Sequence, residues 1–156
     1  MDVEVYTLND IQKWHALLKE IPEMYQDIYF LPQYYQTWEQ HEQAIPYCLV
    51  YKKQGIIIAY SFFKKIINEF NLSADYFDIF SAYGYGGIIS NVEFVPKDII
   101  AEFNATFMEW CTSNNIIAEL IRCHPLLPKE TNHLRPAQYV EVRTNVYILP
   151  FNNYEI

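Results

Sequence analysis

The residues with the clearest capacity to bind a ligand form a short stretch rich in glycine and tyrosine, Ser81 to Ile88. The chain has only four glycines, and three of them fall within Gly84–Gly87, next to Tyr83 and Tyr85. Glycine tolerates positive φ and allows close approach to the backbone, so this clustering predicts a tight, open loop that could bind a ligand. A plain turn whose tyrosines cover the core is an equally open interpretation.

A second group of polar residues follows an apolar stretch. Arg122 and His124 come directly after 116–121, which has the composition of a buried strand. If that strand lies beside the one that ends at Phe80, both side chains would meet the glycine loop. A guanidinium offers two parallel donors and suits a planar or doubly charged oxyanion. The alternative is an arginine paired with a structural carboxylate and a histidine that caps a loop carbonyl.

Two acids are candidates for proton transfer. Asp78 and Glu119 each lie inside an apolar strand, where a carboxylate is costly unless it is paired or faces solvent. Either could act as a general base, although strand alternation favours the simpler interpretation that both point toward solvent. No nucleophile, base and orienting acid occur at a recognisable spacing, so a hydrolase triad has no support.

An aromatic helix is predicted to begin at Pro32, because proline suits the first turn of a helix. It carries Tyr34, Tyr35 and Trp38. Tyr35 and Trp38 could line a cleft for a sugar or peptide, but an aromatic stripe at helical spacing is more often part of a core. Both interpretations stay open.

The elements that position these residues follow from hydrophobic periodicity and turn composition. Thr7–Asp10 predicts a capping box at the start of a helix. Lys52–Gly55 has the composition of a hairpin turn, so the strands on either side should pair antiparallel. Ile88 and Ile89 could briefly extend the strand that precedes the glycine loop. Strands are expected at 2–6, 47–51, 56–63, 75–80, 116–121 and 140–148, and helices at 8–21, from 32, and from 96 to 113, whereas 125–138 shows neither period.

Composition favours a single folded domain. The chain has 156 residues, of which 51% are hydrophobic and 17% aromatic, which excludes a disordered chain and is typical of a sheet-rich or mixed fold. The formal charge of −8 argues against nonspecific binding of DNA, because such binding needs many lysine and arginine contacts to phosphate. An anionic ligand would need a local basic cluster.

The cysteines and the apolar runs bear on the cellular compartment. Cys48, Cys111 and Cys123 are odd in number and far apart, so we expect reduced core residues and neither a disulfide framework nor a metal site. The acidic start of the chain does not resemble a secretory signal, and no apolar run approaches the length of a transmembrane segment. A cytoplasmic protein is therefore expected.

Three stretches form a distinctive combination, Asp27–Tyr35, Tyr76–Gly87 and Ile116–Leu126, in which the tyrosine-glycine loop is followed by an Arg-x-His-Pro-Leu ending. Together they resemble the N-terminal half of the FemABX-like family, whose members pair two GNAT-like domains. The resemblance covers residues 25 to 149. It implies that 1–156 is a single GNAT-like α/β domain, the first half of a longer two-domain pattern. Its sheet would be mixed, mainly antiparallel and flanked by helices, and could be incomplete.

The resemblance also implies a function. Family members are acyltransferases and aminoacyltransferases that build peptidoglycan cross-bridges and other cell-surface structures, and the first domain forms the acceptor-side cleft. The full-length protein would use acyl-CoA or aminoacyl-tRNA as donor, and tRNA is expected as a partner only on this ground. The acceptor would be a small molecule or a peptidoglycan precursor. By resemblance, the cleft would be lined by Tyr83, Gly84, Tyr85, Gly86 and Gly87, with Arg122 and His124 contacting the acceptor or an anion.

Two further interpretations remain. The domain could be a non-catalytic module that binds a ligand or protein through the glycine-tyrosine loop and neighbouring aromatic residues. Such a module could form a homodimer that covers the incomplete sheet. A truncated chain could also lack an independent function. We expect no firmly bound cofactor. Continuation of the reading frame beyond Ile156 into a second α/β domain would favour the enzyme.

Overall fold

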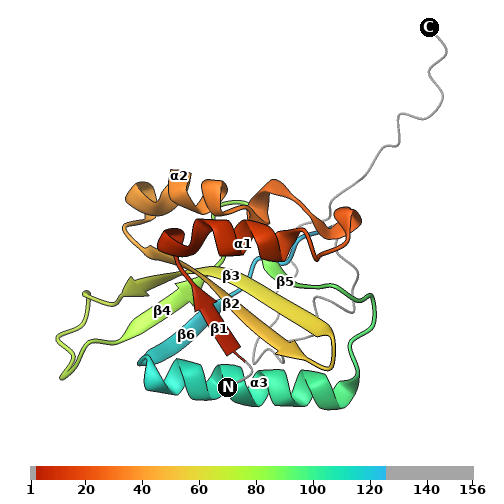
Figure 1. Cartoon of the computed structure of the whole chain (residues 1–156). Helices are drawn as coiled ribbons and strands as arrows, with labels where there is room; N and C mark the ends of the chain where they lie inside the picture. Colours follow the sequence, from red (N-terminus) through yellow and green to blue (C-terminus); the bar gives the residue numbers. More distant parts are fainter. Residues whose placement is uncertain (1–2, 126–156) are drawn as a thin grey trace, which may run out of the picture.

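The computed structural model describes residues 3–125, so the strand predicted at 140–148 and most of the segment 125–138 lie outside the described residues. The described part is a mixed α/β fold in three layers, with α1 and α2 on one face of a sheet and α3 on the other (Figure 1). Its elements are β1 (Val3–Tyr6), α1 (Ile11–Leu18), α2 (Pro32–Glu42), β2 (Ile45–Lys53), β3 (Ile56–Ile66), β4 (Phe77–Phe80), β5 (Gly87–Ser90), α3 (Lys97–Ser113) and β6 (Ile116–Leu120), with short 3₁₀ turns at Leu8–Asp10, Glu23–Tyr25 and Ile28–Phe30.

The sheet is mainly antiparallel, as predicted. Its strand order is β1-β2-β3-β4-β6, and β5 pairs with β3 beside β4. The strand β2 pairs along its whole length with residues 56–64 of the longer strand β3, which confirms the hairpin expected around Lys52–Gly55. Its other edge is shared, because Ile58–Ser61 pairs with β5 and Phe63–Ile66 pairs with β4. Ile88 and Ile89 therefore return to β3 and do not continue β4. The pair β4 and β6 is parallel.

Alternation along β2 and β3 divides the core into two clusters. Side chains on successive positions of a strand point to opposite faces, so one set packs under α1 and α2 and the other under α3. The first cluster contains the buried Trp14 and Tyr35 against Phe63, and the second contains Phe103 and Phe107 of α3 against strand residues. The central strands of the sheet are buried on both faces, as their continuous apolar runs require.

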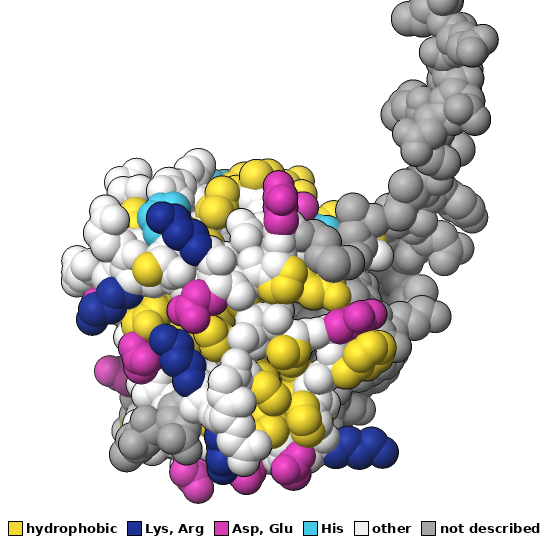
Figure 2. All heavy atoms as spheres, turned by 45° about the vertical axis from the view of Figure 1, so that its right-hand side comes forward, with side chains coloured by type: hydrophobic (Ala, Val, Ile, Leu, Met, Phe, Trp, Pro, Cys, Tyr) yellow, Lys and Arg dark blue, Asp and Glu magenta, His cyan; other side chains and the backbone are white. Residues whose placement is uncertain are grey.

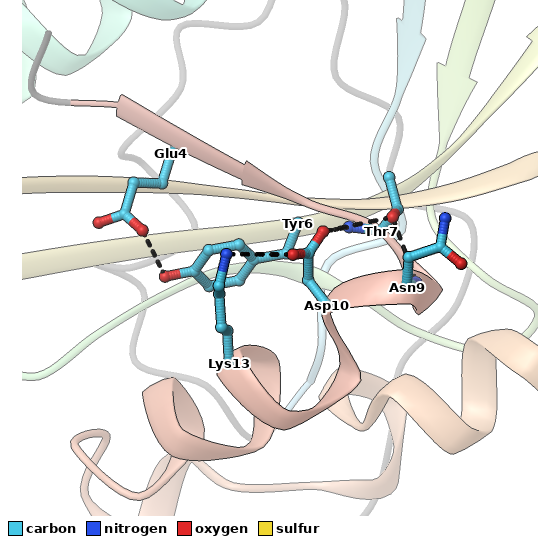
Figure 3. A network of polar contacts seen from close by, with 6 residues as sticks. All are labelled: Glu4, Tyr6, Thr7, Asn9, Asp10 and Lys13. Carbon is cyan, nitrogen blue, oxygen red and sulfur yellow. Dashed lines mark hydrogen bonds and ion pairs between the residues drawn. The ribbon is translucent and has the colours of Figure 1, made fainter.

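Local sequence signals correctly indicated where two helices begin. Thr7 Oγ1 accepts from the Asn9 amide at 3.3 Å, and the Asp10 carboxylate accepts from the Thr7 amide, which forms the predicted capping box (Figure 3). Lys13 adds an exposed ion pair to Asp10. The 3₁₀ turn comes first and the α-helix ends at Leu18, so the helix is shorter than the predicted 8–21. Pro96 caps α3.

Two expectations about burial are wrong. The strand at 116–121 was expected to be buried, but Ile117 is 60% exposed and Leu120 is 59% exposed. These side chains are exposed because β6 lies at the edge of the described sheet, where β4 is its only neighbour among the described strands. Cys123 was expected in the core, whereas it is exposed just beyond this strand; Cys48 and Cys111 are buried. Apolar composition predicted a strand correctly but not its position at the edge of the described sheet.

Candidate functional site

The glycine loop between β4 and β5 is held against the end of β6 by main-chain hydrogen bonds. The Ser81 amide donates to the Leu120 carbonyl at 3.1 Å and the Gly86 amide donates to the Arg122 carbonyl at 2.8 Å. The His124 amide donates to the Gly86 carbonyl at 3.0 Å. Because β4 and β6 are parallel neighbours, the condition that the sequence analysis set is met, and the two motifs lie side by side.

Ser81 strengthens this junction through its side chain. Its buried hydroxyl accepts a hydrogen bond from the Arg122 amide at 3.1 Å. A Cβ at Gly86 would lie 2.8 Å from that hydroxyl oxygen, so the absence of a side chain at Gly86 leaves room for it. The Gly86 amide and carbonyl are both used within the protein. Gly86 therefore joins the glycine loop to the residues that follow β6, and its backbone groups are not available to a ligand.

Glycine is required at position 84 for a different structural reason. Its φ is +90°, a conformation that side chains disfavour, and a Cβ there would lie 2.5 Å from Cε1 of Tyr29. Gly87 also has positive φ, +125°, where the chain turns into β5. The glycines thus allow a tight backbone path and close packing of Tyr29. The outward-facing chemistry of the loop comes from its tyrosine side chains.

His124 is the polar side chain buried at this junction. It is 5% exposed, and its Nε2 lies 3.2 Å from Oδ2 of Asp27, whose side chain is 36% exposed. This contact is a hydrogen bond when the imidazole is neutral and an ion pair when it is protonated. The imidazole ring also packs against Tyr29 and Tyr85, with centroids 5.7 and 5.6 Å away. The carboxylate and the two rings together fix the orientation of the imidazole.

The tyrosines of the loop extend a continuous row of aromatic side chains across the site. Tyr83 stacks on Trp38, with ring centroids 4.8 Å apart, and the Tyr34 hydroxyl donates to the Tyr83 carbonyl at 2.6 Å. Tyr34 meets Tyr29 edge to face at 5.2 Å, and Tyr29 meets Tyr85 at 5.6 Å. These five residues are called the aromatic row below. It joins α2, the 3₁₀ turn at Ile28–Phe30 and the glycine loop.

The aromatic helix α2 contributes one residue to the core and one to the aromatic row, and its role in lining a cleft stays a prediction. Tyr35 is fully buried against Trp14 and Phe63, so it belongs to the core. Burial raises the pKa of its hydroxyl, and the nearby Ala82 amide partly opposes this shift. Trp38 is half-buried and forms part of the site. Tyr35 therefore supports the glycine loop from beneath, and Trp38 contacts Tyr83 of the loop.

The two candidate acids lie on opposite faces of the sheet. Asp78 alternates with Ile79, which packs in the cluster under α3, so Asp78 points toward the side of α1 and α2. Glu119 is the cross-strand partner of Ile79 and shares its face. Both are half-buried, so neither simply points into solvent. They cannot act together on one substrate, and Asp78 is on the same side of the sheet as the aromatic row.

Replacing Asp78 with asparagine is expected to stabilise the protein at neutral pH. Burial raises the pKa of the Asp78 carboxyl, with Lys65 only partly opposing the shift, so the folded state disfavours the charged form. The wild type therefore loses stability as pH rises from the unfolded-state pKa, about 3.9, through the higher folded-state pKa. The advantage of Asp78→Asn should be present at pH 7 and disappear below the unfolded-state pKa, which urea unfolding at several pH values measures.

The exposed Asp75→Asn is the matched control for that experiment and should show little change. A destabilising effect of Asp78→Asn at pH 7 would contradict the burial argument. It would indicate that the attraction between Asp78 and Lys65, which face each other across β3 and β4, outweighs desolvation of the carboxylate.

Asp27, Tyr29 and Phe30 are site residues that the sequence did not single out as candidates. They lie in a connector without helical or strand period, and His124 packs against the Phe30 ring as well as Tyr29. Composition is the signal that could have identified them. Two adjacent aromatic residues shortly after an aspartate carry more apolar surface than a solvent-exposed loop usually does, so this connector is expected to pack against the domain. Arg122, which the sequence did single out, is exposed at the end of β6.

Within 3–125, no group of three or more histidine, cysteine or acidic side chains could hold a metal ion. In the same part of the chain, none of the helices is both long enough and apolar enough to cross a membrane. Acidic and basic side chains are interspersed on the face in Figure 2, which shows no continuous basic patch.

Comparisons with protein-family models, with curated proteins and with solved structures found no match to this chain. The functional argument therefore depends on the local chemistry of the site. Its components are the aromatic row, the buried His124 with Asp27, and the exposed Arg122.

Proposed function

We propose that this domain forms the acceptor-binding side of an acyl- or aminoacyl-transferase, as the first GNAT-like domain of a FemABX-type protein would. The observation that carries the proposal is the hydrogen-bonded junction between the tyrosine-glycine loop and the strand that ends in Arg122 and His124. These are the same two motifs on which the resemblance depends. Their contact brings aromatic, imidazole and guanidinium groups to one end of the sheet, where a polar acceptor would be held.

In this proposal the acceptor lies along the aromatic row, and the acceptor is a cytoplasmic precursor of the cell wall or cell surface. Tyr83 and Tyr85 provide stacking surfaces, and Arg122 and His124 provide polar contacts. Asp27 positions the His124 imidazole. In the transfer step, the acceptor amine or hydroxyl attacks the carbonyl of the donor, the bond to the thiol of CoA or the ribose oxygen of tRNA breaks, and the acceptor proton passes to a base.

The donor is assigned to a second GNAT-like domain. Binding of a pyrophosphate at a glycine loop usually depends on loop amides that lead directly into a helix N-terminus. Here β5 and its following loop separate the glycines from α3, and the Gly86 amide is already bonded to Arg122. Acyl-CoA or aminoacyl-tRNA would therefore be held elsewhere in the full-length protein, facing this acceptor side.

The test is transfer of a labelled acyl or aminoacyl group by the full-length protein to a lysine-containing peptidoglycan precursor. Acyl-CoA and aminoacyl-tRNA are supplied in separate reactions. Tyr85→Ala and Arg122→Ala should each lower kcat/KM about tenfold, the effect of losing roughly 1.4 kcal/mol of transition-state binding. Lys52→Ala, which removes an exposed cation on β2, is the control and should retain activity.

The outcomes separate the parts of the proposal. Wild-type rates in both Tyr85→Ala and Arg122→Ala would contradict the assignment of the site. If the folded protein transfers no group from acyl-CoA and none from aminoacyl-tRNA, the transferase function is contradicted.

A non-catalytic binding module is the second candidate, and one observation favours it. The Gly86 backbone groups are used internally and Tyr29 covers Gly84, so the loop offers aromatic side chains in place of a row of free amides. Such a surface suits binding without chemistry. The exposed Ile117 and Leu120 of β6 would then be covered by a second copy of the chain. A dimer by analytical ultracentrifugation, disrupted by Leu120→Lys, together with no transfer activity, would favour this candidate.

A further inference from the structure

We propose that a second binding site lies on the α3 side of the sheet and that it takes a small organic acid, a carboxylate joined to an aromatic or aliphatic group. Its cation is Lys64 of β3. The apolar side chains around this cation are Ile45, Tyr47, Phe77 and Trp110, and these five residues are called the Lys64 patch below. The site goes beyond the proposed function, because the aromatic row is on the other side of the sheet, with α1 and α2 (Figure 1).

Sheet register and ring contacts bring the Lys64 patch together. Phe62 packs in the cluster under α3, and Lys64, two residues further along β3, projects on the same side. Ile45 is the cross-strand partner of Lys64, and Tyr47 is the partner of Phe62. Trp110 of α3 packs against Phe62 and Tyr47, with ring centroids 5.5 and 6.1 Å away. The patch is therefore built from the middle of the sheet and the last turns of α3.

Two neutral groups hold the Lys64 ammonium in place. Its Nζ lies 4.1 Å from the centroid of the Phe77 ring and donates to Oδ1 of Asn114 at 3.3 Å. Asn114 Nδ2 in turn donates to the Trp110 carbonyl at 2.9 Å, which fixes this carboxamide at the end of α3. An ammonium has three donors. The position of the charge is thus defined, and donors remain for an oxygen of a ligand.

Lys64 forms no ion pair within residues 3–125. The lysine ion pairs of this part of the chain belong to Lys13, Lys52 and Lys53. Burial lowers the pKa of the Lys64 ammonium, as desolvation does for a cation that no carboxylate stabilises. A partly buried charge without a counter-ion is unfavourable for the folded protein. A carboxylate from outside would remove this cost, which is the reason to expect an anionic group here.

The acids on this side of the sheet are too far away or too exposed to take that role. Lys64, Ile79 and Glu119 are consecutive cross-strand partners on β3, β4 and β6. Two strand spacings, about 10 Å, therefore separate the backbones of Lys64 and Glu119. Glu109 precedes Trp110 on α3 and is exposed. Physiological salt largely screens repulsion of a ligand over such distances.

The surroundings of Lys64 select the class of ligand. Ile45 is 55% exposed, and Tyr47 and Trp110 are half-buried, so apolar surface accompanies the charge. An inorganic anion would gain nothing from this apolar surface, and an uncharged apolar molecule would gain nothing from Lys64. A peptide could not add to the sheet here, because β3 is paired on both sides, with β2 and β4. A small organic acid uses both the charge and the apolar surface.

The test is an NMR titration of the full chain at pH 6.5, in salt that screens long-range charge effects, with three probes. 3-Phenylpropionate carries both features, 3-phenylpropionamide lacks the charge, and acetate lacks the ring. 3-Phenylpropionate is expected to shift the Trp110 indole signal in a saturable way and to bind at least threefold more tightly than either other probe. It should also raise the pKa of Lys64, because a carboxylate stabilises the ammonium. The indole of Trp14, buried on the other side of the sheet, should not respond.

Matched variants identify the residues. Lys64→Met removes the charge and should weaken 3-phenylpropionate binding about threefold to fivefold, the size of a partly exposed ion pair. Lys65→Met is its control, because Lys65 points to the opposite face, where it is the cross-strand partner of Asp78. Ile45→Gln should also weaken binding, whereas Ile28→Gln, which is equally exposed at 55% but lies beside the aromatic row, should not. Amide spectra check that each variant is folded.

Several results would overturn the proposal. They are equal binding of 3-phenylpropionate and its amide, equal binding of acetate, no saturable shift of the Trp110 signal, or undiminished binding by folded Lys64→Met and Ile45→Gln proteins. Tighter binding of N-acetyl-glycyl-phenylalanine than of 3-phenylpropionate would replace the small acid with a peptide C-terminus and overturn the choice of ligand. The titration contains no acyl donor, so its failure would leave the proposed transferase function intact. Absence of transfer activity would likewise leave this site intact.

Discussion

Replacing Gly84 with alanine is expected to lower the free energy of unfolding by about 2–5 kcal/mol, the sum of backbone strain and overpacking. The strain arises because φ at this residue is +90°. The overpacking arises because the new Cβ would lie 2.5 Å from Cε1 of Tyr29. The Tyr29 ring cannot move aside freely, since it packs on Tyr34 and Tyr85. Urea unfolding at neutral pH measures the loss.

Gly55 supplies a matched control for Gly84. Its φ is +78°, but a Cβ at this position would meet nothing within 4 Å. Gly55→Ala should therefore cost only the strain, about 1–2 kcal/mol. The difference between the two variants isolates the contact with Tyr29. If both variants lose the same stability, Tyr29 yields without cost, and the glycine at position 84 is required only for its backbone conformation.

Replacing Trp14 with alanine is expected to cost about 3–5 kcal/mol, because a fully buried tryptophan is lost from the core. The effect should also reach the site. The Trp14 indole Nε1 donates to the Phe30 carbonyl at 3.1 Å, and this bond ties α1 to the turn that carries Tyr29. Besides the lower stability in urea, the variant should show altered NMR signals of the His124 ring, which packs on Phe30.

Two other variants separate the packing of Trp14 from its hydrogen bond. Trp14→Phe retains much of the volume but leaves the Phe30 carbonyl without its donor, so a loss of about 1–3 kcal/mol is expected. Trp110→Ala removes a half-buried tryptophan from the opposite face of the sheet. It should cost less than Trp14→Ala and leave the His124 signals unchanged. A His124 response to Trp110→Ala as large as that to Trp14→Ala would contradict the proposed route through Phe30.

These variants also bear on the function, because they alter the site without removing its proposed contacts to the acceptor. Gly84→Ala displaces Tyr29, the member of the aromatic row that touches Tyr34, Tyr85 and His124. A folded Gly84→Ala protein that loses transfer activity, while Gly55→Ala retains it, would show that the row acts as one packed unit.

Several features were predictable because their causes are local. Thr7 and Asp10 are close in sequence and form a capping box wherever the helix lies. Pro96 and Asn115 bound α3, since proline suits a helix start and asparagine tolerates the positive φ of 55° observed after the helix. The glycine cluster likewise predicted a tight loop. The same patterns could not show that Gly84 makes room for Tyr29 and Gly86 for Ser81, because these contacts depend on packing.

The sequence by itself determined the order of the helices and of the described strands other than β5, the β2–β3 hairpin and the places where polar residues follow apolar strands. Only the tertiary structure decided that Asp27 meets His124 across 97 positions, that Asp78 and Glu119 lie on opposite faces, and that β6 exposes Ile117. The physical reason is that helix and strand periodicity report which side of an element is buried. Strand order and register decide which residues meet, and they depend on contacts between residues far apart in the chain.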